Sequence, residues 1–221
     1  TRLQGDWSSD VCSSDLKQMR DLRSRVIEEL MPKAFTRRRS LAAWIDIVNG
    51  WLVVDTSAPK KGDEFMEALI AADVDWAPIR LDTKLSPAAA MTKWLSAGKA
   101  PSGFTIDQDL ELRAAGEDHA TVRYVNHPLE GKEIRDHIAA GKTATRLGLT
   151  WKNRVSFVLT DQWQVKRVSF LELLKEDSED DDLADPQERF DAEFVLVAGE
   201  LSGMLADLVE ALGGEKAPAK D

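Results

Sequence analysis

A short run of cationic residues around a phenylalanine is the segment of this sequence best suited to chemistry. Lys33 and Phe35 are followed by three consecutive arginines, Arg37, Arg38 and Arg39. Clustered lysine and arginine neutralise a phosphate backbone and release its condensed counterions, which gives affinity without sequence preference. An exposed phenylalanine can stack on a base or wedge against a neighbouring molecule. The alternative is a solvated basic turn with Phe35 packed inward, and the residue types alone favour neither.

One further segment resembles part of a nucleotide-binding motif. Gly141-Lys142-Thr143 matches the tail of a phosphate loop, but that pattern requires glycine where this chain has Asp136. The order of elements is also reversed, because a helix is predicted before this segment and a strand after it. Gly141 is therefore expected to end a helix, with Lys142 exposed beyond it.

The histidines and the acidic residues of the apolar segments do not form a recognisable metal site. His119, His127 and His137 lack the spacing of a zinc-binding helix, and we expect them at the surface or in turns. Asp46 and Asp55 flank a predicted hairpin, where structural hydrogen bonding is favoured over magnesium binding. We therefore expect no metal, no other cofactor and no enzymatic activity.

The overall charge opposes a polyanionic partner, but its distribution does not. The 221 residues carry a net charge of -10 and a pI near 4.9, whereas nucleic-acid-binding domains are usually basic. Acid is concentrated in residues 176–182, while residues 17–61 are basic on balance. A phosphate responds to the local field within a Debye length of about 8 to 10 Å. A basic working surface on an acidic protein is therefore possible.

The chain is expected to be cytoplasmic. It has no apolar run of about 18 residues, and it does not begin with a basic stretch followed by an apolar one. Cys12 is the only cysteine, which excludes an internal disulfide and a multi-cysteine metal site. Residues 1–16 show no helical or strand period and resemble translated sequencing-adaptor DNA, so we expect a non-native or disordered tail there.

The first half of the chain predicts alternating helices and strands. Apolar spacing indicates an amphipathic helix from Lys17 that Pro32 closes. Two apolar runs joined by Asn49-Gly50 predict a hairpin over 44–55. The remaining predicted elements are a helix over 60–71, a strand over 76–81 and a helix over 87–97.

The second half predicts an antiparallel sheet followed by a helix. Two short strands are expected around Gly116 in 110–125, a helix in 129–140, and a meander of strands over 143–151, 154–160 and 163–170. In the first strand of the meander, alternation predicts an apolar face with Thr145, Leu147, Leu149 and Trp151, and an opposite face with Ala144, Arg146, Gly148 and Thr150. An acidic linker over 176–185 then leads to a long helix that begins at Pro186 and ends at Gly213-Gly214. The fold class is therefore α+β, with antiparallel sheets and flanking helices.

Several of these segments, taken in order, resemble the RdgC family of recombination-associated proteins. The similarity lies in Leu30-Met31-Pro32-Lys33-Ala34-Phe35-Thr36-Arg37, Trp44-Ile45-Asp46, Val48-Asn49-Gly50, His137-Ile138-Ala139-Ala140-Gly141-Lys142, Gln187-Glu188-Arg189-Phe190 and Glu210-Ala211-Leu212-Gly213-Gly214-Glu215. It extends from about Lys17 to Glu215. The resemblance also implies that the N-terminal part of the family is missing from this chain.

The resemblance implies a curved subunit of a ring-shaped homodimer that is associated with the nucleoid. Such a protein binds double-stranded DNA with little sequence preference and restrains the RecA recombinase. The residues that it implies for DNA binding are Lys33, Phe35, Arg37, Arg123, Lys142 and Arg146. Arg38 and Arg39 are additions to the family pattern, and the segment with Asn126 and His127 is less basic than in relatives.

The sequence predicts that the chain divides into five segments. It also leaves two alternatives to DNA binding. The division is a tail over 1–16, a DNA-binding α+β region over 17–175, the acidic linker over 176–185, a helix over 186–214 that packs on the core, and a tail over 215–221.

In the first alternative, the acidic linker imitates a phosphate backbone and contacts the recombinase directly without DNA. The second and least favoured alternative is a metal-dependent nuclease.

Overall fold

A computed structural model describes residues 10–36, 38–72, 78–116, 120–171 and 185–217 of the chain. The chain divides into an N-terminal unit, Thr1–Ser40, and a C-terminal unit, Leu41–Asp221. The N-terminal unit holds α1 (Asp10–Leu30) and the short 3-10 helix η1 (Met31–Lys33). Helix α1 begins seven residues before the expected start at Lys17, and η1 continues it across Pro32, where the sequence predicts an end.

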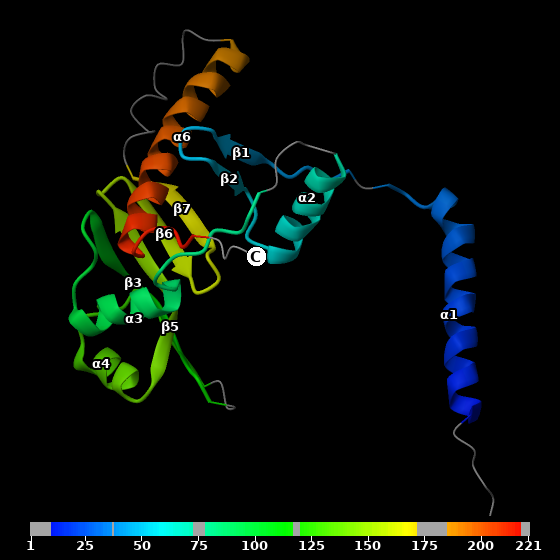
Figure 1. The fold of residues 1–221 in the computed structure, drawn as a ribbon, viewed down its shortest axis with the longest axis horizontal. Helices are drawn as coiled ribbons and strands as arrows, with labels where there is room; N and C mark the ends of the chain where they lie inside the picture. Colours follow the sequence, from blue (N-terminus) through cyan, green and yellow to red (C-terminus); the bar gives the residue numbers. More distant parts are fainter. Residues whose placement is uncertain (1–9, 37, 73–77, 117–119, 172–184, 218–221) are drawn as a thin grey trace, which may run out of the picture. The chain divides into compact units, whose positions relative to one another are not determined.

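In its described residues, the C-terminal unit is an α+β structure with two antiparallel sheets, as predicted (Figure 1). The smaller sheet pairs β1 (Ala43–Asp46) with β2 (Trp51–Val54). The larger sheet has the strand order β4-β3-β5-β6-β7. Its strands are β3 (Phe104–Ala114), β4 (Thr121–Tyr124), β5 (Lys142–Trp151), β6 (Val155–Thr160) and β7 (Val165–Phe170). The helices of this unit within the described residues are α2 (Pro59–Ala71), α3 (Pro87–Ala97), α4 (Lys132–Ala139) and α6 (Pro186–Ala211).

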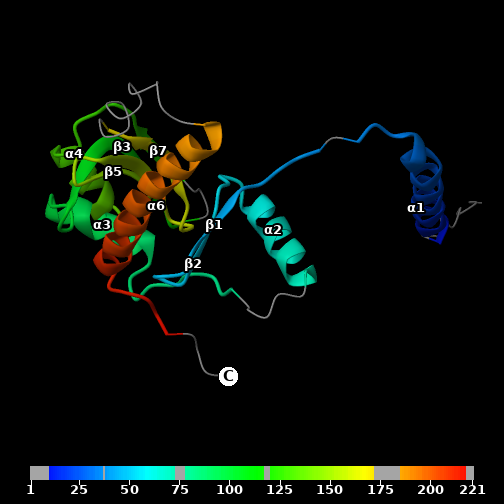
Figure 2. The same cartoon turned by 90° about the horizontal axis from the view of Figure 1, so that it is seen from above.

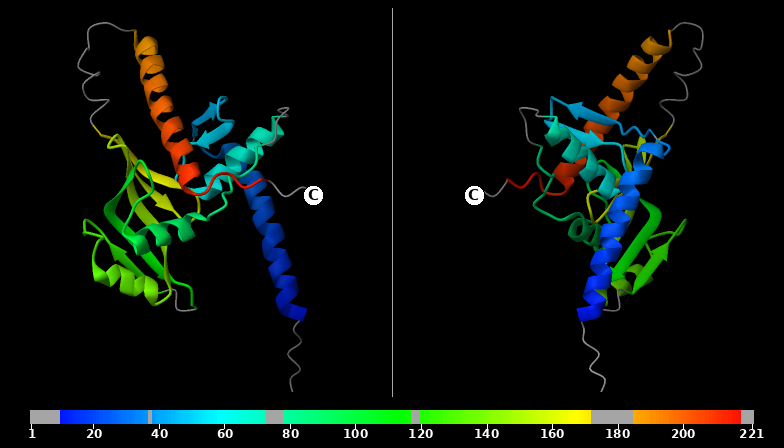
Figure 3. Two further views of the ribbon diagram at one scale, coloured as in Figure 1. Left: turned by 60° about the vertical axis from the view of Figure 1, so that its left-hand side comes forward. Right: turned by 90° about the vertical axis from the view of Figure 1, so that its right-hand side faces the viewer.

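Helices α3, α4 and α6 contribute to one apolar core on one face of the larger sheet. The core joins side chains of β3, β5 and β6 to side chains of these three helices. Its fully buried members include Met91 of α3, Ile134 of α4, Leu147 and Leu149 of β5, and Leu208 of α6. In Figure 3 the C-terminal half of α6 lies beside the sheet and the N-terminal half extends away from it, which agrees with exposed apolar side chains in the first half. The sheet therefore has one covered face and one face left to polar residues.

Local signals fix the ends of α3 where the sequence predicts them. Ser86 precedes the helix and its side chain accepts a hydrogen bond from Ala89 N, while Pro87 occupies the first turn. Gly98 ends the helix with a φ of 61°, a left-handed conformation that glycine adopts at low cost. Both ends thus depend on residues adjacent in the chain.

The hairpin of β1 and β2 differs from the predicted two-residue turn. Asp46 pairs with Trp51, so four residues rather than Asn49-Gly50 alone form the connection. The Asp46 carboxylate accepts hydrogen bonds from the backbone N–H groups of Val48 and Asn49, each over 3.0 Å, and this contact favours the longer turn. Asn49 also donates to Ser202 Oγ of α6, and Figure 2 shows the hairpin beside that helix.

The strand predicted over 76–81 is wrong in its described part, residues 78–81, which form no strand. Pro78 has no backbone N–H to donate to a neighbouring strand. Antiparallel pairing begins later, where Thr83 bridges to Glu215 and Leu85 N donates to Leu212 O. The segment after α6 therefore occupies the position of a strand partner, which the sequence pattern did not reveal.

Candidate nucleic-acid interface

The face of the larger sheet opposite the apolar core carries the candidate interface. On the central strands β3 and β5, alternation and register place Glu111 directly between Arg123 of β4 and Arg146 of β5. A shallow depression lies over these strands. Its lining residues are Asp109, Leu110, Glu111, Arg123, Tyr124, Arg146, Val158, Lys166 and Arg167. Four of these nine carry positive charge and two carry negative charge, so the depression is cationic on balance.

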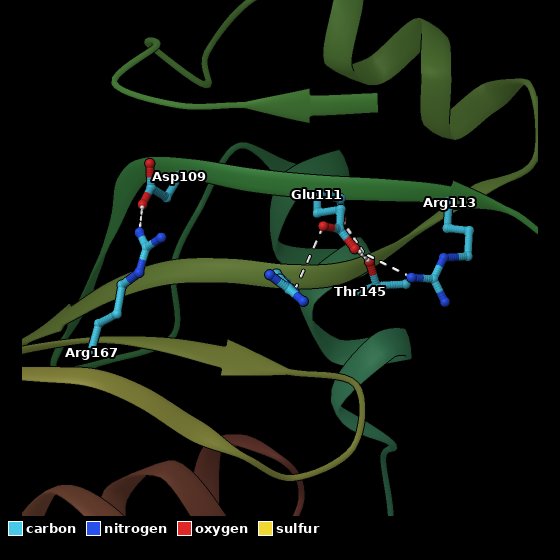
Figure 4. A network of polar contacts seen from close by, with 6 residues as sticks. Asp109, Glu111, Arg113, Thr145 and Arg167 are labelled. Carbon is cyan, nitrogen blue, oxygen red and sulfur yellow. Dashed lines mark hydrogen bonds and ion pairs between the residues drawn. The ribbon is translucent and has the colours of Figure 1, made fainter. Parts of the chain in front are cut away.

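Glu111 is the buried centre of a network of cationic side chains (Figure 4). Its Oε1 accepts a hydrogen bond from Thr145 Oγ1 over 2.9 Å and lies 3.4 Å from an Arg113 guanidinium nitrogen. Its Oε2 lies 3.7 Å from Arg146 Nε. The side chains of Arg113 and Arg146 are 46% and 42% exposed, so their remaining N–H groups are accessible from solvent.

A β-bulge at Thr145 brings its side chain into this network. Glu111 pairs with Arg146 and Leu112 pairs with Ala144, so Thr145 is the extra residue on β5. Ala144 then joins the apolar core, and its N–H donates to Thr92 Oγ1 of α3 over 2.9 Å. The predicted faces of β5 are therefore wrong for Ala144 and Thr145, which exchange sides. The prediction is confirmed for Leu147, Leu149 and Trp151 as core residues.

A second ion pair lies across the sheet, between β3 and β7. Arg167 donates to Asp109 Oδ2 over 2.8 Å, and Asp109 Oδ1 accepts from Asn126 N over 3.4 Å. Arg167 has a φ of 54°, and the register of β7 against β6 shifts at this point. A left-handed conformation is unfavourable for arginine, so the bulge and the ion pair to Asp109 must compensate for it.

Asp107 lies on the same face but contacts a hydroxyl instead of a cation. Both of its carboxylate oxygens accept from Thr150 Oγ1, over 3.0 and 2.9 Å. Desolvation by burial raises the pKa of Asp107, and the hydrogen bond from Thr150 partly offsets this. A Cβ on Gly148 would lie 3.1 Å from the Asp107 Cβ and 3.3 Å from the Asp109 Cβ. Glycine at this position therefore lets β3 approach β5 closely.

The structure brings only some of the predicted DNA-binding residues together. Arg123 and Arg146 line the same depression. Lys142 shares the face of Ala144 at the start of β5, and its Nζ lies 3.3 Å from His137 Nδ1 of α4, so it belongs to the covered side of the sheet. Lys33 and Phe35 lie in the N-terminal unit, where Phe35 is fully exposed and not packed inward. Arg37 lies outside the described residues.

Sequence reasoning missed three cations and three acids of this face. The predicted site residues did not include the cations Arg113, Lys166 and Arg167, or the acids Asp107, Asp109 and Glu111. The signal was alternation along β3, where Asp107, Asp109, Glu111 and Arg113 are spaced by two residues. The cations of β7 carry no such signal because the bulge at Arg167 interrupts their alternation.

Two features are absent from the described residues. No group of three or more His, Cys, Asp or Glu side chains in the described part of the chain is placed to hold a metal ion. Among the same residues, no helix is long and apolar enough to cross a membrane.

The fold and the site define an α+β protein in which one sheet face is packed by helices and the other displays arginine and lysine around one buried and two half-buried carboxylates. A family model described as "Putative exonuclease, RdgC" matches residues 12–215. The chain belongs to the RdgC family.

Curated relatives of the chain carry the name "Recombination-associated protein RdgC". The relative from Cupriavidus necator is 53% identical over 200 residues, which cover 90% of this chain and 67% of that protein. The relative from Dechloromonas aromatica is 53% identical over 207 residues, covering 92% and 68%. The relative from Ralstonia nicotianae is 49% identical over 201 residues, covering 90% and 65%. About a third of each relative has no counterpart in this chain.

Proposed function

We propose that the chain binds double-stranded DNA without sequence preference and acts in homologous recombination by restraining the RecA recombinase. The observation that carries this proposal is the cationic depression on the larger sheet, where Arg123, Arg146, Lys166 and Arg167 converge. Contacts from arginine and lysine to phosphates position a protein on DNA but read no sequence. The relatives' name supports a role in recombination.

The dimensions of the face suit a DNA backbone. Arg123 on β4 and Lys166 on β7 are separated by four steps between adjacent strands. At about 4.8 Å for each step, the cations extend over roughly 19 Å. One strand of B-DNA presents a phosphate about every 3.4 Å along the helix axis, so the face can contact several phosphates of one duplex.

The residue types favour duplex over single-stranded DNA. Single strands are usually bound by aromatic side chains that stack on exposed bases. Tyr124 is the only aromatic residue that lines the depression, and it is half-buried. Six of the other eight lining residues are charged, and the four cations among them match a phosphate backbone.

We further propose that the basic loop and Lys142 supply additional contacts. Lys33 and Arg37 bind phosphates, and the exposed Phe35 stacks at the DNA or against a second subunit of a homodimer. Lys142 lies at the start of β5 on the opposite face, so its proposed contact with DNA is separate from those of the cationic depression. The direct binding of the recombinase by the acidic linker remains an alternative, and all of that linker except Asp185 lies outside the described residues.

The experiment that tests the proposal compares two double variants of the chain. Arg123→Ala with Arg146→Ala should lower the slope of log affinity against log salt by about 1.8 if each arginine contacts one phosphate. The matched control is the double variant Lys93→Ala with Lys99→Ala. Lys93 lies in α3 and Lys99 lies just after it, and both are exposed on the helix-covered side of the sheet. This control should retain the wild-type slope. Equal slopes in the two double variants would refute the proposed interface.

The family description that mentions an exonuclease is tested separately. Linear duplex DNA labelled at one end and incubated with the chain and magnesium should remain full length, because we propose a binding protein and not an enzyme. Progressive shortening that increases with protein concentration would contradict the proposal. A mock preparation from cells that do not express the chain, purified in the same way, is the control for contaminating nucleases.

A further inference from the structure

Glu111 differs from the other carboxylates of the cationic face in its depth and in its neighbours. It is 8% exposed, and the register places it between Arg123 and Arg146, with Arg113 two residues along the same strand. A buried carboxylate is costly unless hydrogen bonds and charges compensate for it. The arrangement therefore pairs Glu111 with Arg146, one of the guanidinium groups that the proposed function assigns to phosphates, and with the neighbouring Arg113.

Glu111 is held more firmly by the hydroxyl than by the arginines. The hydrogen bond from Thr145 Oγ1 spans 2.9 Å, whereas the nearest guanidinium atoms of Arg113 and Arg146 lie at 3.4 and 3.7 Å. Charge-assisted hydrogen bonds normally span about 2.7–2.9 Å, so both ion pairs are loose. The arginines can leave without displacing the carboxylate, because Thr145 still holds it.

We propose that Glu111 is an internal counterion that competes with DNA phosphates for Arg113 and Arg146. In the free protein the two guanidinium groups share the Glu111 carboxylate, and on binding they turn to phosphate oxygens while Glu111 remains bonded to Thr145. This inference rests on the proposed function and adds a residue that weakens binding. A ligand with several closely spaced phosphates is favoured, since it must replace this internal partner at more than one arginine.

The test compares two substitutions that remove the same charge from the same face. Glu111→Gln retains an oxygen that accepts from Thr145 but has no charge to hold the arginines. Asp107→Asn is the matched control, because Asp107 is bonded to Thr150 and has no ion pair among the described residues. Duplex binding is measured by fluorescence anisotropy at low salt and a pH of about 8, where carboxylates are ionised.

We expect Glu111→Gln to bind duplex DNA about three- to fivefold more tightly than Asp107→Asn, the range given by loss of a partly exposed ion pair. Equal affinities would mean that only net charge matters and would overturn the inference. Weaker binding by Glu111→Gln than by wild type would show that Glu111 positions the arginines for DNA, which also overturns it. Unchanged binding and slope after substitution of Arg123 and Arg146 would instead refute the proposed function.

A second measurement follows DNA binding by the wild-type chain itself. The Nε–H signals of Arg113 and Arg146 in nitrogen-15 spectra of the wild-type chain, assigned with Arg→Lys substitutions, are followed as duplex DNA is added. Both signals should shift together in proportion to the bound fraction, because both arginines change partner. Binding without a shift of either signal would overturn the inference.

Discussion

Trp151 Nε1 donates a hydrogen bond to Asp207 Oδ2 over 2.7 Å and so joins the last residue of β5 to α6. The same carboxylate oxygen lies 2.9 Å from Lys152 Nζ, and that ammonium group stands 4.6 Å from the centre of the Trp151 ring. The hydrogen bond that Asp207 accepts from Lys152, followed by the one from Trp151, lowers the pKa of Asp207. This cluster fastens α6 to the sheet on the side opposite the candidate interface.

Asp207→Ala should therefore destabilise the chain. Loss of the charged acceptor leaves the indole N–H of the buried Trp151 without its partner, and hydrogen bonds to charged groups contribute about 1.5–3 kcal/mol. Urea denaturation should show a free energy of unfolding lower by this order. Lys152→Ala is the comparison: its side chain is half exposed, so its loss should cost less than about 1 kcal/mol. A variant at Asp207 as stable as wild type would refute this account of the cluster.

Two glycines of α6 should respond in opposite directions to alanine. A Cβ at Gly203 would lie 3.2 Å from Trp151 Cη2, whereas a Cβ at Gly199 meets nothing within 4 Å. Gly199→Ala should stabilise the chain by about 0.5–1 kcal/mol, since alanine favours the helix. Gly203→Ala should show no such gain and should destabilise by about 1 kcal/mol or more, because Trp151 is fixed in the core. Thermal and urea denaturation of the two variants measure these changes. Equal stabilisation by both substitutions would contradict the prediction that they act in opposite directions.

The sequence predicted those parts of the fold that depend on neighbouring residues. Helix α3 begins at Pro87 and ends before Gly98 because its start and stop residues are adjacent to it. The bulge at Thr145 depends on the side chain of Glu111, which is 34 residues away, and no local pattern indicates it. The predicted alternation of β5 is therefore wrong at Thr145, where the register between β3 and β5 shifts.

The candidate site also depends on contacts between residues that are distant in the sequence. Arg123 and Arg146 come together because both strands pair with β3 at Glu111, and only the register shows this. Lys142 is four residues from Arg146, yet it lies on the opposite face, because the strand alternates and the bulge shifts its phase. The residue types predict a cationic surface, whereas the pairing and register of the strands determine which cations lie on the same face.

The free energy of unfolding should decrease at acid pH because the Asp46 carboxylate becomes protonated. Its carboxylate accepts hydrogen bonds from Ser202 Oγ over 2.6 Å and Asn49 Nδ2 over 2.8 Å, and together with backbone N–H groups these lower its pKa from 3.8 to about 2. Because the folded pKa lies below the unfolded pKa, the ionised form stabilises the fold above the unfolded value. This stabilisation is lost as the pH falls from about 4 to about 2.

The Asp46 prediction is checked by urea denaturation at several pH values. Asp46→Asn should have a smaller decrease in the free energy of unfolding between pH about 4 and about 2 than wild type, because asparagine does not titrate. Asp55→Asn, at an exposed position after β2, is the control and should retain the wild-type decrease. Identical curves for Asp46→Asn and wild type would refute the assignment.

The loop that contains Phe35 allows charge and stacking to be separated by salt. If Lys33 and Arg37 each contact one phosphate, Lys33→Ala with Arg37→Ala should reduce the slope of log affinity against log salt by nearly 2, at about 0.9 for each contact. Phe35→Ala should weaken binding with little change of slope, because a fully exposed aromatic ring releases no counterions when it stacks. Duplex binding at several salt concentrations measures both quantities. Unchanged affinity and slope in a folded charge variant would show that this loop does not contact DNA, and the sheet face alone would then account for binding.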